Sequence, residues 1–209
     1  MDEPRFSDQP APIPGGPART SRRADLAGLP GITARMRVSN LLMTHDLPEA
    51  RQAFTNLTID DYTIVRMIAQ EGAMTGTEPA LRYSAIAALG ESPSATNLNL
   101  LTDLARFGED FYVRGHALLA LGATGCYAHL APVLSGLSAE EPFEQAAATT
   151  ALSLLIEATS AAAVREHARL LGGADDANRV DTVAARRQET PAHRAQRRAQ
   201  TSSGEGRPS

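Results

Sequence analysis

Apolar residues in the middle of the chain recur at the three- and four-residue spacings that place side chains on one face of a helix. The segment Leu81–Gly90 reads LRYSAIAALG, and 32 residues further on the segment Val113–Gly122 reads VRGHALLALG. The identical positions are Arg82, Ala85, Ala88, Leu89 and Gly90 in the first copy, and Arg114, Ala117, Ala120, Leu121 and Gly122 in the second. Self-similarity at a fixed spacing of this size predicts a protein built of stacked repeats.

Each repeat is expected to hold two helices that pair as a hairpin. Capping residues, prolines in first turns and closing glycines divide the sequence into four such hairpins. Gly90 stands where a helix commonly turns left-handed and stops. No segment shows the sustained period of two that is typical of a half-buried strand. The predicted helices are 32–44 by itself, then 46–57 with 58–72, 78–90 with 92–108, 110–122 with 130–137, and 142–155 with 160–171.

The composition divides the chain into three parts. Residues 1–30 hold six of the thirteen prolines and are predicted to be a disordered Pro-rich segment. Residues 31–171 carry the apolar pattern and are long enough for one core. After Gly172 and Gly173 the sequence turns polar, so 172–209 is predicted to be a disordered Arg-rich tail, with transient helix over 178–188. The expected fold is all-α: an α-solenoid of about four antiparallel helix hairpins between two disordered tails.

The distribution of charge limits the class of partner. Residues 31–171 carry 9 Arg against 15 acidic residues, whereas 172–209 carry 7 Arg against 5 acids. All basic residues are Arg, none Lys. An acidic body is a poor surface for phosphates, so this interpretation disfavours nucleic acid as a partner.

The single Cys126 excludes an intrachain disulfide and fits a reducing compartment. No apolar run approaches the roughly 18–20 residues that a membrane span needs. The first residues, Asp2, Glu3 and Pro4, do not open an apolar signal segment. We therefore expect a cytoplasmic protein without a membrane span.

The second copy of the pattern resembles a known repeat family. Its residues Asp110, Val113, Arg114, Ala117, Ala120, Leu121, Gly122 and Gly125 look like a HEAT-like repeat of the short type, also called the phycobilin-lyase type. Residues 78–107 match this type well and 142–171 match it weakly, with Gln145 in place of the Arg and Ser153 in place of the Gly. The resemblance is specific for the fold and unspecific for function.

In this family the Arg commonly lies at the junction of two repeats and pairs with an acidic group there. The resemblance therefore implies inter-repeat structural roles for Arg82 and Arg114, with Glu78, Glu109 and Asp110 as acidic partners or helix caps. Recurrence itself favours the same interpretation of Gly90 and Gly122, because a position needed in every hairpin serves stacking.

No motif for a phosphate loop, a dinucleotide or a zinc protease occurs. His116, Cys126 and His129 stand near one inter-helix turn, but zinc sites usually show tighter paired spacings. We predict neither catalytic residues nor a cofactor nor a metal, and the interpretation of these three residues is structural.

A specific function is expected where the repeat copies differ. Tyr83 and His116 occupy positions beside the apolar stripes of two different repeats, where side chains face outward, and Asn97, Asn99 and Arg106 lie on a second helix. These five are candidates for partner binding; the alternative is an ordinary solvated face.

The leading hypothesis is a non-catalytic scaffold or adaptor that binds another, basic protein on the solenoid face. The resemblance adds a second hypothesis, a tetrapyrrole (bilin) lyase or chaperone-like helper. A third, a DNA-repair enzyme, is opposed by the acidic body.

Overall fold

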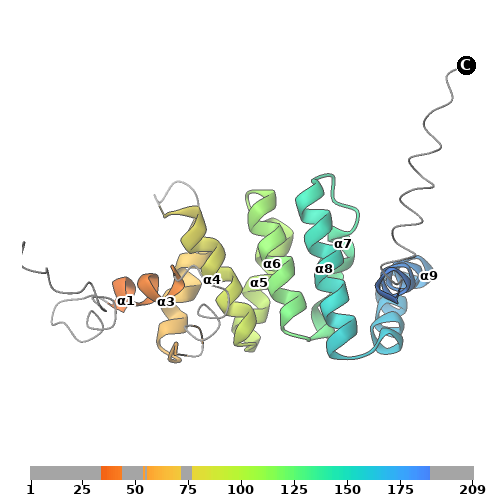
Figure 1. Cartoon of the computed structure of the whole chain (residues 1–209), viewed down its shortest axis with the longest axis horizontal. Helices are drawn as coiled ribbons and strands as arrows, with labels where there is room; N and C mark the ends of the chain where they lie inside the picture. The colour runs from red at the N-terminus through yellow and green to blue at the C-terminus, as the bar shows by residue number, and fades with distance from the viewer. Residues whose placement is uncertain (1–33, 44–53, 55, 72–76, 189–209) are drawn as a thin grey trace, which may run out of the picture. The chain divides into compact units, whose positions relative to one another are not determined.

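The computed structural model describes residues 34–43, 54, 56–71 and 77–188 (Figure 1). The chain divides into two units, Met1–Thr33 and Ala34–Ser209, and all described residues belong to the second. They form eight α-helices and one short 3-10 helix, with no strand among them. In chain order these are α1 (Ala34–Leu42), α3 (Asp61–Gln70), α4 (Pro79–Glu91), α5 (Ala95–Phe107), α6 (Phe111–Ala123), the 3-10 helix η3 (Tyr127–His129), α7 (Leu130–Gly136), α8 (Pro142–Ala158) and α9 (Ala161–Gln188).

The helices are arranged in two layers. The front layer is α4, α6 and α8, which pack side by side in chain order and face the viewer in Figure 1. The rear layer contains α3, α5 and α7, and each of these packs against the front helix that follows it in the chain. This alternation is what stacked antiparallel hairpins require, so the predicted all-α repeat fold is confirmed. The expected helix 46–57 lies outside the described residues except for Phe54, Asn56 and Leu57.

Glycines set the spacing of the front helices. A Cβ on Gly90 would lie 2.8 Å from the carbonyl oxygen of Ala120, and one on Gly122 would lie 2.5 Å from the Cα of Ala151. Both glycines are buried within their helices. The prediction that Gly90 ends its helix in a left-handed conformation is therefore wrong: α4 continues to Glu91, and the glycine is needed because the next helix approaches its backbone.

Aliphatic side chains fill the space between the layers. Because a single hairpin leaves one apolar face uncovered, these side chains reach full burial only when neighbouring hairpins stack. Each fully buried Leu or Ile contributes about 1.5–3 kcal/mol relative to an exposed one. The largest in the front and rear layers are Ile68, Ile86, Leu89, Leu101, Leu118, Leu121, Leu130, Leu152 and Leu155.

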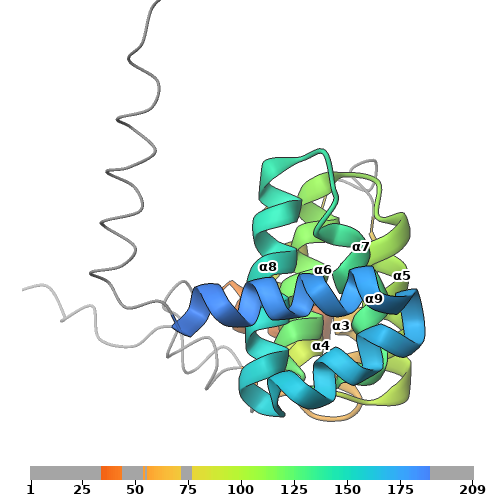
Figure 2. The same cartoon turned by 90° about the vertical axis from the view of Figure 1, so that its right-hand side faces the viewer.

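The C-terminal part of the body extends further than the sequence predicted. α9 breaks at Gly173, which has φ 77° and ψ −151°, and a second helical segment then continues to Gln188. Figure 2 shows this segment crossing in front of α7 and α8. The prediction of a disordered tail from residue 172 is therefore wrong for 172–188, because Ala177, Val180 and Val183 form a short buried stripe. The predicted tails 1–30 and 189–209 lie outside the described residues.

Candidate functional site

Five ring side chains of three successive front helices form one continuous cluster, here called the aromatic face: Tyr83 of α4, Phe111, Tyr112 and His116 of α6, and Phe143 of α8. The rings of Tyr83 and His116 are stacked, with centroids 4.4 Å apart and planes 13° apart. His116 and Tyr112 each contact Phe143, at centroid distances of 5.6 and 5.2 Å. Tyr83 and Tyr112 are 6.3 Å apart. The rings therefore bridge three repeats.

The aromatic face arises where the repeat copies differ. Tyr83 corresponds to Gly115 in the next copy, and Ser84 corresponds to His116. A Cβ on Gly115 would lie 2.4 Å from Cε1 of Phe143. The missing side chain at Gly115 thus leaves the space that the Phe143 ring occupies, and the ring in turn reaches His116.

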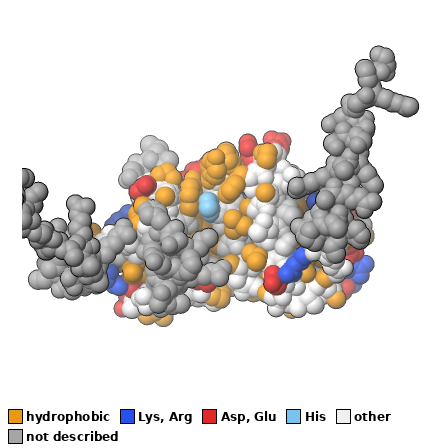
Figure 3. All heavy atoms as spheres, viewed as in Figure 1, with side chains coloured by type: hydrophobic (Ala, Val, Ile, Leu, Met, Phe, Trp, Pro, Cys, Tyr) orange, Lys and Arg blue, Asp and Glu red, His pale blue; other side chains and the backbone are white. Residues whose placement is uncertain are grey.

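The cluster is partly open to solvent. The side chain of Tyr112 is 46% exposed, and the other four rings are half-buried. Figure 3 shows hydrophobic side chains gathered around a histidine on the face formed by the front helices. Exposed Ala87 and half-buried Leu119 extend this surface along α4 and α6. A partly exposed aromatic surface of this kind is unlike a solvated polar face.

Acidic residues lie at the same ends of the front helices as the aromatic face. Glu78, Asp110 and Glu141 are the N-cap residues of α4, α6 and α8. Negative side chains at helix N-termini are favoured by the helix dipole, and Figure 3 shows acidic side chains along the upper edge. Desolvation raises the pKa of Tyr83, and the charge of Asp110 raises it further. Burial lowers the pKa of His116 despite the opposing effect of Asp110, which favours the neutral form of its imidazole.

The two repeated arginines lie at repeat junctions beside the aromatic face. Arg82 donates from Nε to the carbonyl oxygen of Ala69 at 3.0 Å, and its two terminal nitrogens bind both carboxylate oxygens of Glu109, one at 2.9 Å. Arg114 donates from Nε to Glu144 at 3.0 Å, and Nη1 donates to the carbonyl oxygen of Gly108 at 3.0 Å. Both guanidinium groups are thus engaged within the fold.

Comparison with protein families now adds to the geometry. Residues 71–154 match the family model described as HEAT repeats. This stretch of the chain consists of HEAT repeats. It includes α4 to α7 and most of α8, and so it includes every residue of the aromatic face. A comparison with curated proteins finds no match. The family model describes HEAT repeats as a class, so the short, phycobilin-lyase type stays a prediction.

The remaining candidates lie in the rear layer of the HEAT repeats, away from the front helices. Asn97 is only 1% exposed: its Oδ1 accepts from Arg66 at 3.0 Å and its Nδ2 donates to the carbonyl oxygen of Ser92 at 2.8 Å. Its prediction as a partner-binding residue is therefore wrong, because these internal hydrogen bonds hold the amide inside. Asn99 and Arg106 are exposed on α5, and Asn99 lines a shallow groove between α3 and α5.

The structure places His116 apart from His129, and Cys126 is the N-cap of η3, whose last residue is His129. His116 stacks on Tyr83 in the front layer, whereas Nδ1 of His129 lies 3.0 Å from the hydroxyl of Thr102 in the rear layer. Within residues 34–188, excluding the gaps, no group of three His, Cys, Asp or Glu side chains is placed to hold a metal ion. Of the described helices, none combines the length and apolarity needed to cross a bilayer.

Asp110 lies at the start of α6, where its Oδ1 accepts a hydrogen bond from the backbone N–H of Val113 at 2.8 Å.

Sequence reasoning found Tyr83 and His116 but missed Phe111, Tyr112 and Phe143. A signal for them was present: Phe111 directly follows the N-cap Asp110 and Tyr112 comes next, and Phe143 directly follows the first-turn proline Pro142. Rings at this position of successive repeats come together because the helix N-termini lie side by side.

Proposed function

We propose that the HEAT-repeat body is a non-catalytic interaction module that binds a basic segment of another protein on the aromatic face. The observation that carries the proposal is the ring cluster spanning three repeats, stacked at Tyr83 and His116 and open at Tyr112. Its neighbouring arginines are already paired with Glu109 and Glu144. The surface thus offers π-faces and negative charge, and among the described residues of the aromatic face there is no unpaired arginine that would compete with a basic partner.

A basic partner follows from two independent interactions. The face of an aromatic ring attracts a guanidinium or ammonium group, and the contribution is about 0.5–1 kcal/mol at an exposed site. The acidic caps Glu78, Asp110 and Glu141 add a long-range attraction, which raises the rate of encounter with a positive segment. Arg suits the site better than Lys, because its planar group also stacks on rings.

The competing interpretation is that the rings only hold the repeats together. Such a purely structural cluster would be shielded from solvent, whereas Tyr112 exposes 46% of its surface. The two interpretations differ in what the truncation of Tyr112 changes. A binding role predicts lost affinity with a nearly unchanged free energy of unfolding, and a structural role predicts the reverse.

The chain offers a direct readout, because it has four tyrosines and no tryptophan. Titrating the full chain with the peptide GSRGSRGS, which lacks aromatic residues, should change the tyrosine emission. Tyr112→Ala should remove most of that change. The matched control is Tyr127→Ala, since Tyr127 is 39% exposed and lies on η3, outside the aromatic face. Equal losses in both variants, or no binding by the unaltered chain, would contradict the proposal.

A tetrapyrrole-related role, as lyase or chaperone-like helper, is the second candidate. It rests on the resemblance to the short repeat type, and the aromatic face supports it because partly exposed rings such as Tyr112 and Phe143 stack on flat conjugated ligands. Adding a bilin to the full chain should then shift its visible absorption band, and Tyr112→Ala should abolish the shift. An unshifted spectrum would remove this candidate and leave the protein-binding proposal untouched.

A further inference from the structure

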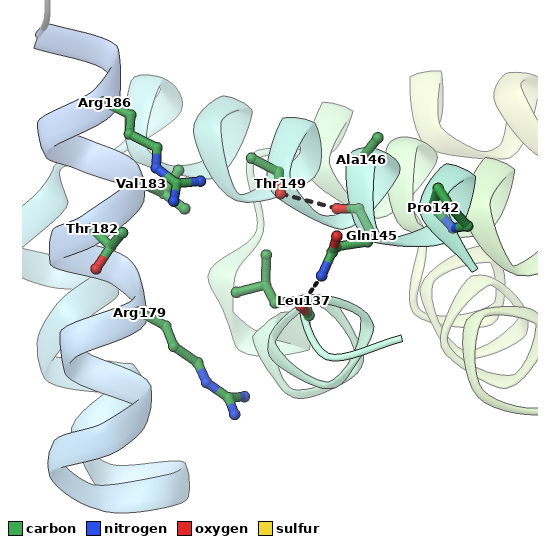
Figure 4. Close-up of a pocket in the computed structure, with 9 residues that line it drawn as sticks. All are labelled: Leu137, Pro142, Gln145, Ala146, Thr149, Arg179, Thr182, Val183 and Arg186. Carbon is green, nitrogen blue, oxygen red and sulfur yellow. Dashed lines mark hydrogen bonds between the residues drawn. The ribbon is translucent and has the colours of Figure 1, made fainter. Parts of the chain in front are cut away.

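A second recess differs from the aromatic face in its charge, because its charged lining residues are arginines. It is a groove of about 400 Å³ between α8 and the second helical segment of α9. One wall carries Arg179, Thr182 and Arg186, and the other carries Leu137, Gln145 and Thr149 (Figure 4). Nine residues line the groove, and none of them is acidic.

The arginine wall has a helical register. Arg179, Thr182, Val183 and Arg186 follow at i, i+3, i+4 and i+7, which places them on one face of α9. Val183 is 6% exposed and forms the base between the two arginines. Figure 4 shows both guanidinium groups directed from α9 toward the α7 and α8 side, without converging on one point.

The two arginines differ in how they are held. Arg179 donates to the carbonyl oxygen of Leu134 at 3.3 Å and lies 3.4 Å from a carboxylate oxygen of Asp176. Arg186 has no acidic partner among the described residues, although the neighbouring Arg187 is paired with Glu157 at 2.7 Å. The groove therefore contains one oriented and one uncommitted guanidinium in a body that is otherwise acidic.

The opposite wall supplies polar groups of fixed orientation. Nε2 of Gln145 donates to the carbonyl oxygen of Leu137 at 3.1 Å, and the hydroxyl of Thr149 donates to the carbonyl oxygen of Gln145 at 2.9 Å. The side-chain carbonyl of Gln145 accordingly stays available to accept from a ligand N–H. Guanidinium groups on one wall and an amide acceptor on the other suit a peptide that carries carboxylates.

We propose that this groove binds an acidic, extended segment of a partner protein. Arg179 and Arg186 are seven residues apart on a helix, which separates their backbones by about 10 Å. A single small anion therefore reaches one of them. An extended peptide in the polyproline-II conformation rises about 3.1 Å per residue with three residues per turn, so carboxylates three residues apart lie on one side of it at about 9 Å, which matches the two arginines. Arg forms charge-assisted, bidentate hydrogen bonds with such carboxylates.

The sign of the charge argues against the segment that follows in this chain. Residues 189–209 carry four Arg and two Glu, so their net charge repels the arginine wall. The proposal therefore takes the occupant to be supplied in trans, and the acidic residues 1–8 of this chain enter the test as the alternative. Because the groove shares no residue with the aromatic face, the two sites provide for two partners of opposite charge, and each proposal stands or fails by itself.

The test is binding of a fluorescein-labelled peptide, GSEASEGS, to the full chain, followed by fluorescence anisotropy at low ionic strength. We expect Arg186→Glu to weaken binding about tenfold or more, because it reverses a charge-assisted contact. The matched control is Arg169→Glu, which makes the same change at an exposed arginine of α9 that does not line the groove, and it should stay within about twofold of the unaltered chain. The glutamine peptide GSQASQGS should show no measurable binding to the unaltered chain or to either variant.

Three results would overturn the inference. Equal affinities of the Arg186→Glu and Arg169→Glu variants would place the binding elsewhere. If inorganic phosphate displaced the labelled peptide at the same concentration as an unlabelled glutamate peptide does, the groove would be a site for a single small anion. Tighter, Arg186-dependent binding of a peptide of residues 1–8, which carry three acids and one Arg, would make this chain's own N-terminus the occupant.

Discussion

The ring of Phe143 in α8 occupies the space that a side chain on Gly115 in α6 would need: a Cβ there would lie 2.4 Å from Cε1 and 2.8 Å from Cδ1 of the ring. The glycine sits mid-helix, where it costs about 1 kcal/mol relative to Ala. The same missing side chain allows Phe143 to pack closely across the repeat junction. Two residues 28 positions apart in the sequence are thus coupled through one contact.

The first prediction tests this coupling. Gly115→Ala should displace Phe143 and lower the free energy of unfolding by about 1–2 kcal/mol, because an added methyl overpacks the junction. In a Phe143→Ala background the same change should instead stabilise the protein by up to about 1 kcal/mol, since only the gain in helix propensity remains. Urea unfolding of the four proteins of this double-mutant cycle measures the coupling. Additive effects of the two changes would mean that the residues act independently.

The second prediction concerns the junction arginine Arg82, whose side chain is 7% exposed. Arg82→Met should destabilise the fold by about 2 kcal/mol, because it leaves the carbonyl oxygen of Ala69 and the carboxylate of Glu109 without this donor. Arg82→Lys should recover little, since an ammonium cannot reproduce the Nε and bidentate contacts. The control is Arg169→Met at the exposed pair with Glu166, where no measurable change in the urea midpoint is expected.

The third prediction concerns pH. Burial holds the pKa of His116 below its unfolded value, so the unfolded chain binds a proton at His116 more readily than the folded chain does. Its contribution to stability is therefore unchanged above the unfolded pKa of about 6.5 and falls as the pH drops below it. His116→Gln should flatten the decline in unfolding free energy between about pH 7 and 5. His167→Gln serves as the comparison, and an equal flattening there would show that the decline is not specific to His116.

The fourth prediction concerns the C-terminal boundary. A chain that ends at Leu171 loses the burial provided by Val180 and Val183, which are 0% and 6% exposed. Each fully buried Val contributes about 1.5–3 kcal/mol, so this truncation should lower the unfolding midpoint clearly. A chain that ends at Gln188 should unfold like the full chain. If both truncations matched the full chain, the second segment of α9 would not belong to the folded body.

Much of this architecture was predictable because periodicity is a local property of the sequence. The helices of the second and third hairpins follow from stripes such as Val113, Ala117 and Leu121, whose spacing alone determines which face is buried. The structural reason for Gly90 was not local. It depends on the approach of Ala120 from a neighbouring helix, and a glycine near the end of an apolar stripe equally resembles a helix stop.

The candidate sites were predictable only in part, for the same physical reason. Tyr83 and His116 stood out because the repeat copies differ there, but their stacking depends on the lateral register of α4 and α6. Asn97 looked outward-facing by position, and its burial depends on hydrogen bonds with Arg66, 31 residues earlier, and with the carbonyl oxygen of Ser92. The arginine groove was not predicted, because Gly172 and Gly173 indicated the end of the folded body. The apolar stripe beyond them consists of small residues, which give only a weak periodic signal in the sequence.

The most direct measurement of the central claim is site-specific photo-crosslinking in cells that express the full chain. A benzoylphenylalanine placed at Tyr112 should crosslink a defined partner through a basic segment, and the same group at Tyr127 should not give that product. A synthetic peptide of the identified segment should then bind the Tyr112→Ala variant about tenfold more weakly than the Tyr127→Ala variant. Identical crosslinked products at the two positions, or equal affinities of the two variants, would contradict the account.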